Sequence, residues 1–283
     1  MAFQITDKKQ LAKDIKSISI NAPDIASHAK SGQFVVIIAK ENSERIPLTI
    51  ADSDTNKGTI TIIFQEVGFS TRELGSLNAG ENIQHILGPL GTATHIEPFG
   101  TVVCIAGGVG IAEVLPVARA MKKGGNRLLT IIGARTKDLI ILENKLRETS
   151  DELFITTDDG SYGKKGFVTD TLKELLTVVE KSTHTKYPEL VYAVGPVAMM
   201  KAAAELTRTY NIKTIVSLNP IMVDATGMCG SCRVSVGGKT KFGCVDGPEF
   251  DGHLVNFEEL QKRLNSFKEK EECLNQNCPI SNQ

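Results

Sequence analysis

The sequence predicts a β plus α/β fold made of an antiparallel barrel, a five-stranded parallel sheet with helices on both faces, and a small cysteine-rich unit. Short β-rich runs occupy residues 1–98, apolar strands alternate with helices in 99–219, and a glycine- and cysteine-rich stretch with a charged, helical tail occupies 220–283. A chain of 283 residues has room for about two domains with cores of their own, plus a small unit.

The barrel is predicted from short runs in which apolar and polar side chains alternate. The alternation is clearest in residues 59–64, and turn residues separate one run from the next. The runs expected to form strands are 15–20, 33–39, 45–51 and 58–64.

The parallel sheet is predicted from a repeated order of strand and helix. Five strands alternating with four helices indicate parallel pairing, with helices covering both faces of the sheet. Strands are expected at 101–107, 127–134, 152–157, 190–195 and 213–218, and helices at 111–124, 138–148, 167–180 and 197–210.

Composition excludes several classes of function. The 32 Lys and Arg nearly balance the 33 Asp and Glu, so no basic field attracts nucleic acid or an anionic membrane. No apolar run approaches the roughly 18 residues of a spanning helix, and the first residues lack a signal core, so we expect a cytoplasmic protein. Six cysteines in that compartment do not predict disulfides, and the three within 229–244 indicate metal.

The cysteine-rich unit contains a close pair of thiols and a more distant third. Cys229 and Cys232 form the pair, Cys244 follows, and Asp224 precedes them where a fourth ligand would stand. With cysteine in place of Asp224, the spacing is close to that of a loop-bound 2Fe-2S cluster. The same residues could instead hold zinc in an interaction module, or the pair could be a redox-active dithiol, and an aspartate in a loop is often only a turn residue.

Loops that contain glycine follow three of the predicted strands. Residues 107–110 lie between a strand and a helix, where backbone can approach a phosphate and a helix N-terminus offers N–H groups. Gly195-Pro196 ends a second strand and 158–161 a third, at the sheet edge where open α/β sheets bind ligands. The match to a dinucleotide fingerprint is imperfect, and the first loop could serve strand-to-helix geometry alone.

Two further motifs lie in the barrel segment. Arg45-Ile46-Pro47-Leu48-Thr49 puts a cation and a hydroxyl on one face of a strand, with a rigid proline between them. Residues 67–71 open a helix with hydroxyls that could cap it or bind a pyrophosphate. Neither motif decides a function by itself.

Together these motifs resemble the ferredoxin-reductase-type flavoproteins over nearly the whole chain. The order RIPLTIAD, GPLG, AGGVGIAEVLP, TDDGSYGKKGFVTD, YAVGP, MCGSCRV and CVDGPEF is similar to two sister families. One is the electron-transfer subunit of dihydroorotate dehydrogenase, which has cysteine at the position of Asp224. The other is the small subunit of NADH-dependent reduced ferredoxin:NADP⁺ oxidoreductase (sulfide dehydrogenase subunit beta), in which an aspartate joins three cysteines. This second family is the favoured assignment.

The resemblance implies cofactors and residue roles. FAD would bind the barrel, NAD(H) the parallel sheet, and a 2Fe-2S cluster the four ligands Asp224, Cys229, Cys232 and Cys244. The residues implied to contact FAD are Arg45, Pro47, Leu48, Thr49, Gly68, Ser70 and Thr71, with Arg45 on a phosphate and Thr49 near the flavin N5. The residues implied to contact the nicotinamide nucleotide are Gly107, Gly108, Gly110, Asp159, Gly195 and Pro196.

The implied function is electron transfer in a heterodimer. The chain would exchange hydride with NAD(H) and single electrons with a larger, glutamate-synthase-like subunit that binds NADP(H) and connects to ferredoxin, in flavin-based electron bifurcation. The alternatives are the electron-transfer subunit of NAD-dependent dihydroorotate dehydrogenase and a zinc-stabilised module that is not an enzyme.

Several residues receive no role or a limited one. Hydride transfer needs no general acid or base, so no catalytic side chain is assigned and the five histidines are expected to be surface or packing residues. Asp138 and Asp159 would repel a 2'-phosphate that Arg135 could otherwise bind, which favours NAD over NADP. Cys104 is expected in the core. Cys273 and Cys278 could be incidental thiols or part of a subunit contact.

Overall fold

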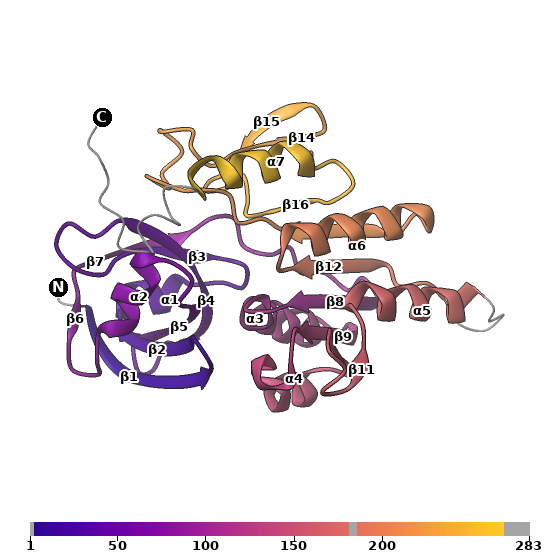
Figure 1. Ribbon diagram of the computed structural model, residues 1–283, viewed down its shortest axis with the longest axis horizontal. Coiled ribbons are helices and arrows are strands. Elements are labelled where there is room, and N and C mark those ends of the chain that lie inside the picture. The colour runs from indigo at the N-terminus through magenta and orange to yellow at the C-terminus, as the bar shows by residue number, and fades with distance from the viewer. Residues whose placement is uncertain (1–2, 181–185, 269–283) are drawn as a thin grey trace.

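The structure is a computed structural model that describes residues 3–180 and 186–268. A barrel and a helix-covered sheet lie side by side, and a smaller C-terminal unit packs over both of them (Figure 1). Cys273, Cys278 and His184 lie outside the described residues.

The barrel is one antiparallel sheet of seven strands in the order β6-β1-β2-β5-β4-β3-β7. Its edge strands β6 and β7 are separated in the chain only by Gln84, so the sheet must curl until its two edges meet. The strands are β1 Phe3–Ala12, β2 Ile15–Asn21, β3 Phe34–Ile38, β4 Arg45–Asp54, β5 Thr59–Gln65, β6 Asn82–Ile83 and β7 His85–Leu90.

The predicted barrel is confirmed, with strands and helices beyond the four expected runs. β1 was not predicted because DKK interrupts its apolar residues. β7 was not predicted because it contains Gly88-Pro89, and proline is rare within strands. Two short helices, α1 Pro23–His28 and α2 Phe69–Ser76, complete the barrel unit. A buried core of isoleucine, valine, leucine and phenylalanine fills its interior.

The second sheet has the order β11-β10-β9-β8-β12-β13-β16. The five predicted strands pair in parallel, the short β11 extends one edge in the same sense, and β16 pairs antiparallel to β13 at the other edge. The strands are β8 Thr101–Gly107, β9 Arg127–Ala134, β10 Glu152–Thr157, β11 Lys164–Lys165, β12 Leu190–Val194, β13 Lys213–Ser217 and β16 Glu249–Asp251.

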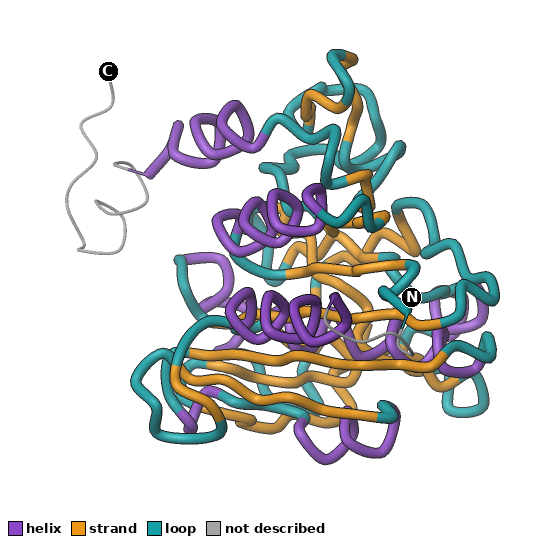
Figure 2. The backbone as a smooth tube through the Cα atoms, turned by 90° about the vertical axis from the view of Figure 1, so that its right-hand side faces the viewer, coloured by secondary structure: helices purple, strands orange, loops and turns teal. Residues whose placement is uncertain are grey.

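Helices cover both faces of this sheet, as predicted. Along β8 the side chains of Cys104 and Ala106 face the core under α3, while Val103 and Ile105 face the core under α5 and α6. The strands are largely apolar, and Figure 2 shows helices lying against them. The helices are α3 Gly110–Lys123, α4 Glu143–Thr149, α5 Val168–Glu180 and α6 Val197–Thr209.

The helix expected at 138–148 is shorter than predicted. A 3₁₀ turn, η1 Lys137–Leu139, comes first, and Leu142 then adopts a left-handed conformation with φ +56°. A residue with positive φ cannot lie within an α-helix, so α4 begins only at Glu143. The apolar periodicity was correct, and the break comes from one backbone angle.

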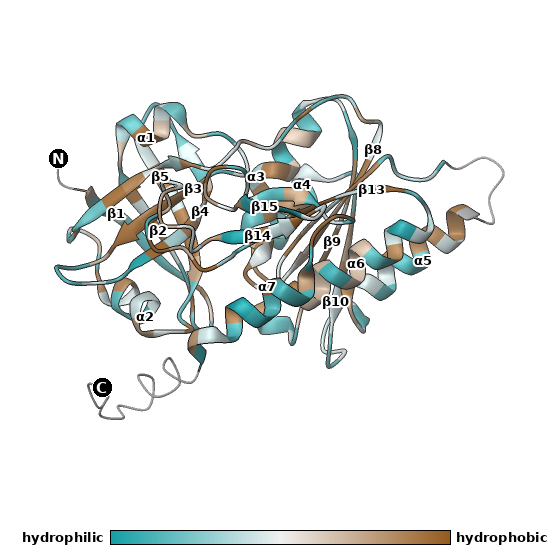
Figure 3. Ribbon diagram, turned by 90° about the horizontal axis from the view of Figure 1, so that it is seen from above, coloured by the Kyte–Doolittle hydropathy of each residue, from teal (hydrophilic) through white to brown (hydrophobic). Residues whose placement is uncertain are grey.

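The C-terminal unit consists of a hairpin, the edge strand β16 and a helix. β14 Arg233–Val236 and β15 Lys239–Phe242 are joined by Gly237-Gly238, both with positive φ, as a tight hairpin turn requires. Asn256 caps α7 Phe257–Leu264 by accepting from the Glu259 N–H, and η2 Asn265–Phe267 follows. Helix α7 is mostly polar (Figure 3), consistent with the expected charged helical tail. The unit boundaries at residues 98 and 219 stay predictions.

One helix joins the two large units. Helix α3 packs against both β8 and β4, and its apolar residues form one buried cluster with Ile15, Ala51 and Ile63 of the barrel. Arg119 of α3 adds an ion pair with Asp52 of β4 at 3.1 Å. The barrel and the sheet therefore share a core, which fixes their relative position.

A half-buried carboxylate joins all three units at a second place. Glu249 of β16 accepts hydrogen bonds from the hydroxyls of Thr94, at 2.6 Å, and Tyr192, at 2.8 Å. Burial raises the pKa of Glu249 above its ordinary value of 4.5, and the two hydrogen bonds partly oppose this shift. Its contribution to stability is therefore complete below pH 4.5 and is lost as the pH rises through the raised pKa.

We predict that Glu249→Gln will be at least as stable as the wild type at pH 8 and will lose this pH dependence. The amide oxygen can accept both hydrogen bonds, and no charge has to be buried. Glu249→Leu is the contrasting variant, because it leaves two hydroxyls without an acceptor at a cost of about 1–3 kcal/mol each. Urea unfolding followed by circular dichroism at pH 5 and pH 8 measures both effects. If the free energy of unfolding changes equally with pH in wild type and Glu249→Gln, Glu249 is not the source of the pH dependence.

Candidate functional site

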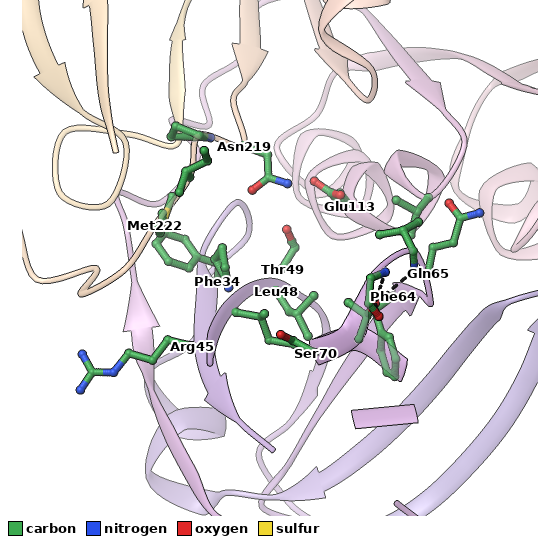
Figure 4. Close-up of a pocket in the computed structure, with 18 of the residues that line it drawn as sticks. Phe34, Arg45, Leu48, Thr49, Phe64, Gln65, Ser70, Glu113, Asn219 and Met222 are labelled. Carbon is green, nitrogen blue, oxygen red and sulfur yellow. Dashed lines mark hydrogen bonds between the residues drawn. The ribbon is translucent and has the colours of Figure 1, made fainter. Parts of the chain in front are cut away.

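A cavity of about 580 Å³ opens where the barrel meets the C-terminal unit (Figure 4). Its walls come from β4, the start of α2, the first turn of α3 and the segment after β13. The lining residues include Phe34, Arg45, Pro47, Leu48, Thr49, Gln65, Gly68, Ser70, Thr71, Val109, Glu113, Ser217, Asn219 and Met222. All seven residues expected to contact FAD are among them.

Strand β4 presents its first half to this cavity. Residues 45–49 pair only with β3, whereas pairing with β5 begins at Ile50. The cavity side of residues 45–49 is thus free of a neighbouring strand, and Pro47, which has no N–H, fits such a position. Arg45 points away from the middle of the cavity (Figure 4), with its guanidinium 3.4 Å from the Asp224 carboxylate.

The start of α2 leaves room for a ligand. The Thr71 hydroxyl accepts from the N–H groups of Val67 and Gly68, each at 3.1 Å, so it closes the first turn of the helix. A Cβ added at Gly68 would meet no atom within 4 Å, so the space beside it is open. Ser70 and the first N–H groups of α2 are left to face the cavity.

A second cavity, of about 590 Å³, lies at the carboxyl ends of β8, β9, β10 and β12. Helix α3 leaves β8 on one face of the sheet and α6 leaves β12 on the other, so this is the switch point where such sheets bind ligands. Its lining includes Gly107, Gly108, Gly110, Arg135, Asp158, Phe167, Gly195, Pro196 and Met199.

The three glycines of the loop at 107–110 meet two kinds of constraint. A Cβ on Gly110 would lie 2.6 Å from the Val194 carbonyl oxygen, and one on Gly107 would lie 2.7 Å from the Met199 sulfur. Gly108 has φ +59° and no atom near its missing Cβ, so its backbone is open to a ligand. Close packing thus explains two glycines, and access explains the third.

Of the two adjacent aspartates after β10, it is Asp158 that lines the second cavity. Asp159, the residue expected near a ribose, is exposed and lies outside the lining, and its carboxylate accepts from the Ser161 N–H and hydroxyl at 2.9 and 2.6 Å. Those bonds lower the pKa of Asp159. Sequence order could not separate two adjacent aspartates that point in different directions.

The two cavities share a wall made of Gln65, Val109, Glu113, Ser217 and Asn219. None of these residues was expected at the site. The signal for Glu113 was present, since it is a single acid within the apolar GIAEVLPV segment that directly follows the glycine loop. Gln65 and Ser217 are the last residues of β5 and β13, and Asn219 lies two residues beyond β13, so only the fold brings them together.

The segment 224–244, called the thiol loop below, packs against residues that line the first cavity. Phe34 and Met222, which line that cavity, form one buried cluster with Cys232 and Cys244. The two sulfurs lie 3.2 Å apart, and burial raises the pKa of Cys244 to about 12. Cys229 is exposed and lies 3.1 Å from the Ser231 hydroxyl.

The loop directs backbone N–H groups at its sulfurs. The hydroxyl and N–H of Ser231 and the N–H of Asp224 lower the pKa of Cys229 to about 7. The Gly227 N–H similarly favours the charged form of Cys244. Positive φ values at Gly227 and Gly230 turn the backbone inward. This donor set and these N–H groups fit an iron-sulfur cluster, whose sulfurs accept such bonds.

The four predicted ligands come only partly together. Cys232 and Cys244 form a pair and Cys229 lies on the same loop, while the Asp224 carboxylate is held by Thr226 and Arg45. Among the described residues, no three acidic, histidine or cysteine side chains lie within reach of one metal ion. The ligand set therefore stays a prediction.

Comparison with known families agrees with these sites. Residues 104–205 match the oxidoreductase NAD-binding domain, and residues 219–256 match the iron-sulfur cluster binding domain of dihydroorotate dehydrogenase B. Most of the lining of the cavity at β8 and β12, and the whole thiol loop, lie within the matched segments. The expected NAD(H) and iron-sulfur cofactors are thereby confirmed, and FAD is typical of this fold.

Relatives match over nearly the whole chain. A dihydroorotate dehydrogenase B (NAD⁺) electron-transfer subunit homolog of Thermotoga maritima is 45% identical, covering 95% of this chain and 92% of its own. A probable electron-transfer subunit of the same enzyme from Methanocaldococcus jannaschii is 37% identical, covering 88% and 90%. A chain from the solved NADH-dependent reduced ferredoxin-NADP oxidoreductase is 42% identical, with a TM-score of 0.91 and 98% of each chain covered.

Barrel, nucleotide sheet and thiol loop define an oxidoreductase of the ferredoxin-reductase type. More distant structures share only this fold, such as phthalate dioxygenase reductase at 18% identity and a TM-score of 0.57. The chain belongs to the family of dihydroorotate dehydrogenase B electron-transfer subunits. Its 42% identity to the ferredoxin-NADP oxidoreductase chain is similar to its 45% identity to the Thermotoga maritima relative. No helix within the described residues is long and apolar enough to span a membrane.

We predict that Asp158→Asn will improve binding of NADPH relative to NADH by about tenfold, or roughly 1.4 kcal/mol. The Asp158 carboxylate lines the second cavity and would repel a 2'-phosphate. Fluorescence titration of the protein with NADPH and with NADH gives the two dissociation constants and their ratio. Asp159→Asn is the matched control variant. A larger change in the affinity ratio for Asp159→Asn than for Asp158→Asn would show that Asp159 is the residue near the ribose.

Proposed function

We propose that the chain is an FAD- and 2Fe-2S-containing electron-transfer subunit that exchanges hydride with NAD(H) and single electrons with a larger partner. The supporting observation is that three sites adjoin one another. The second cavity shares a wall with the first, and residues lining the first pack directly on Cys232 and Cys244. Hydride and electrons would each cross only a short distance.

The first cavity suits FAD. Ser70 and the N–H groups that open α2 would receive the pyrophosphate, and Arg45 would exchange its weak contact with Asp224 for a phosphate. The Thr49 hydroxyl would lie near the flavin N5, at the wall that the first cavity shares with the second. Bound FAD supplies the conversion between a two-electron hydride donor and one-electron acceptors.

The second cavity suits a nicotinamide nucleotide. The open backbone of Gly108 would let the nucleotide approach the start of α3, and Gly195-Pro196 would support the nicotinamide beside the shared wall. Asp158 would lie near the adenosine ribose and disfavour a 2'-phosphate. Asp224, Cys229, Cys232 and Cys244 would hold the cluster, with the N–H groups of the loop bonded to its sulfurs.

The partner is proposed to be a glutamate-synthase-like subunit that binds NADP(H) and connects to ferredoxin. The similarity to a chain of NADH-dependent reduced ferredoxin-NADP oxidoreductase, described for flavin-based electron bifurcation, supports this assembly. The presence of Asp224 beside three cysteines supports it further. The names of the Thermotoga maritima and Methanocaldococcus jannaschii relatives support a second candidate, electron transfer from dihydroorotate to NAD⁺.

The cofactor content of the native complex, purified without oxygen, tests the proposal. We expect one FAD and one 2Fe-2S cluster in this chain, and loss of their visible absorbance when NADH is added. Zinc without iron and sulfide would overturn the electron-transfer function. A glutamate-synthase-like partner would support the ferredoxin assembly, and a barrel-type partner that produces orotate would support the second candidate.

We predict that Asp224→Cys will keep a 2Fe-2S cluster and shift its midpoint potential by on the order of 100 mV. An oxygen ligand donates charge to ferric iron differently from a thiolate, so the potential should respond to the exchange. EPR spectra and redox titration measure the change. Asp52→Cys places a cysteine on the barrel as a control, and an unchanged spectrum and potential in Asp224→Cys would exclude Asp224 as a ligand.

A further inference from the structure

Glu113 occupies the place where the two cavities meet. It lies in the first turn of α3, directly after the glycine loop, and lines both cavities. The Thr49 hydroxyl lies close enough to its carboxylate to stabilise the charged form. Figure 4 shows Thr49, Glu113 and Asn219 around the same part of the first cavity. This carboxylate thus lies beside Thr49 of β4, at the wall across which hydride would pass.

The surroundings of Glu113 favour a carboxyl group that can hold a proton. Burial raises the pKa of Glu113, and the hydrogen bond from Thr49 opposes this shift. The polar side chains that share its wall, Gln65, Ser217 and Asn219, are neutral. The charged residues elsewhere in the two linings are Glu44, Arg45, Arg135 and Asp158, and none of them is a cause of the shift.

The proposed function creates a need for such a group. Oxidation of NADH to NAD⁺ releases two electrons and one proton, which arrive together as hydride. Electrons then leave singly for an iron-sulfur cluster, which carries no proton with them. One proton per hydride must therefore leave the first cavity by way of the protein or solvent, and a nucleotide in the second cavity would cover one of the exits.

We propose that Glu113 accepts this proton through the Thr49 hydroxyl and passes it to solvent at the cavity mouth. The inference rests on the proposed function. Thr49 gives the hydroxyl proton to the neighbouring Glu113 carboxylate and takes up the released proton in its place. Hydride transfer itself needs no acid or base, so Glu113 acts only when electrons leave.

Glu113→Gln tests the proposal because it keeps the shape and hydrogen bonding of the side chain but cannot accept a proton. In the FAD-loaded complex, reduction by NADH should stay within about threefold of wild type. Reoxidation by a one-electron acceptor such as ferricyanide should slow by on the order of 100-fold and lose its pH dependence. Glu113→Asp should recover part of the rate. Glu205→Gln, an exposed acid on α6, is the control and should match wild type.

An equilibrium measurement complements the rates. In wild type, a plot of flavin midpoint potential against pH should bend where Glu113 titrates, and in Glu113→Gln the bend should be absent. Equal reoxidation rates, pH profiles and midpoint plots in wild type and Glu113→Gln would overturn the role of Glu113 and leave the proposed function intact. A wild-type protein that binds no FAD, or is not reduced by NADH, would overturn the proposed function and this inference with it.

Discussion

The packing of α3 between the sheet and the barrel is the constraint on which the site depends. Its apolar face buries against β8 and β12, while its other contacts reach Ile15, Ala51 and Ile63 of the barrel. Because protein cores are close-packed, this shared cluster leaves little freedom for one unit to move against the other. The glycine loop before α3 and the first turn of the helix thereby become the wall between two cavities.

The thiol loop depends on the same frame for its position. It has few apolar residues of its own, and Met222, Ala225, Cys232 and Cys244 are buried only because the barrel strand β3 supplies Phe34 and Val36. The pairing of β16 with β13 holds the other end of the segment against the sheet. A short loop that could not form a core alone is thus kept next to the first cavity.

Two half-buried carboxylates mark the junctions between units. Glu249 joins the linker at Thr94 to Tyr192 in the sheet, and Glu113 joins α3 to Thr49 in the barrel. Burial raises the pKa of both, but their settings differ. One oxygen of Glu249 accepts both hydroxyl donors, which suits a structural role, whereas Glu113 faces two ligand-sized cavities, which suits exchange of a proton.

The sequence by itself determined the fold class, the strand-helix order, the glycine loops and the thiol spacing, because these follow from local periodicity and short spacings along the chain. It missed β1, whose lysines interrupt the pattern, and the left-handed Leu142 that delays α4. Only the tertiary structure decided that Asp158 rather than Asp159 lines the nucleotide cavity and that Glu113 faces Thr49. Those facts depend on side-chain direction and on contacts between distant segments, which packing sets and local sequence does not encode.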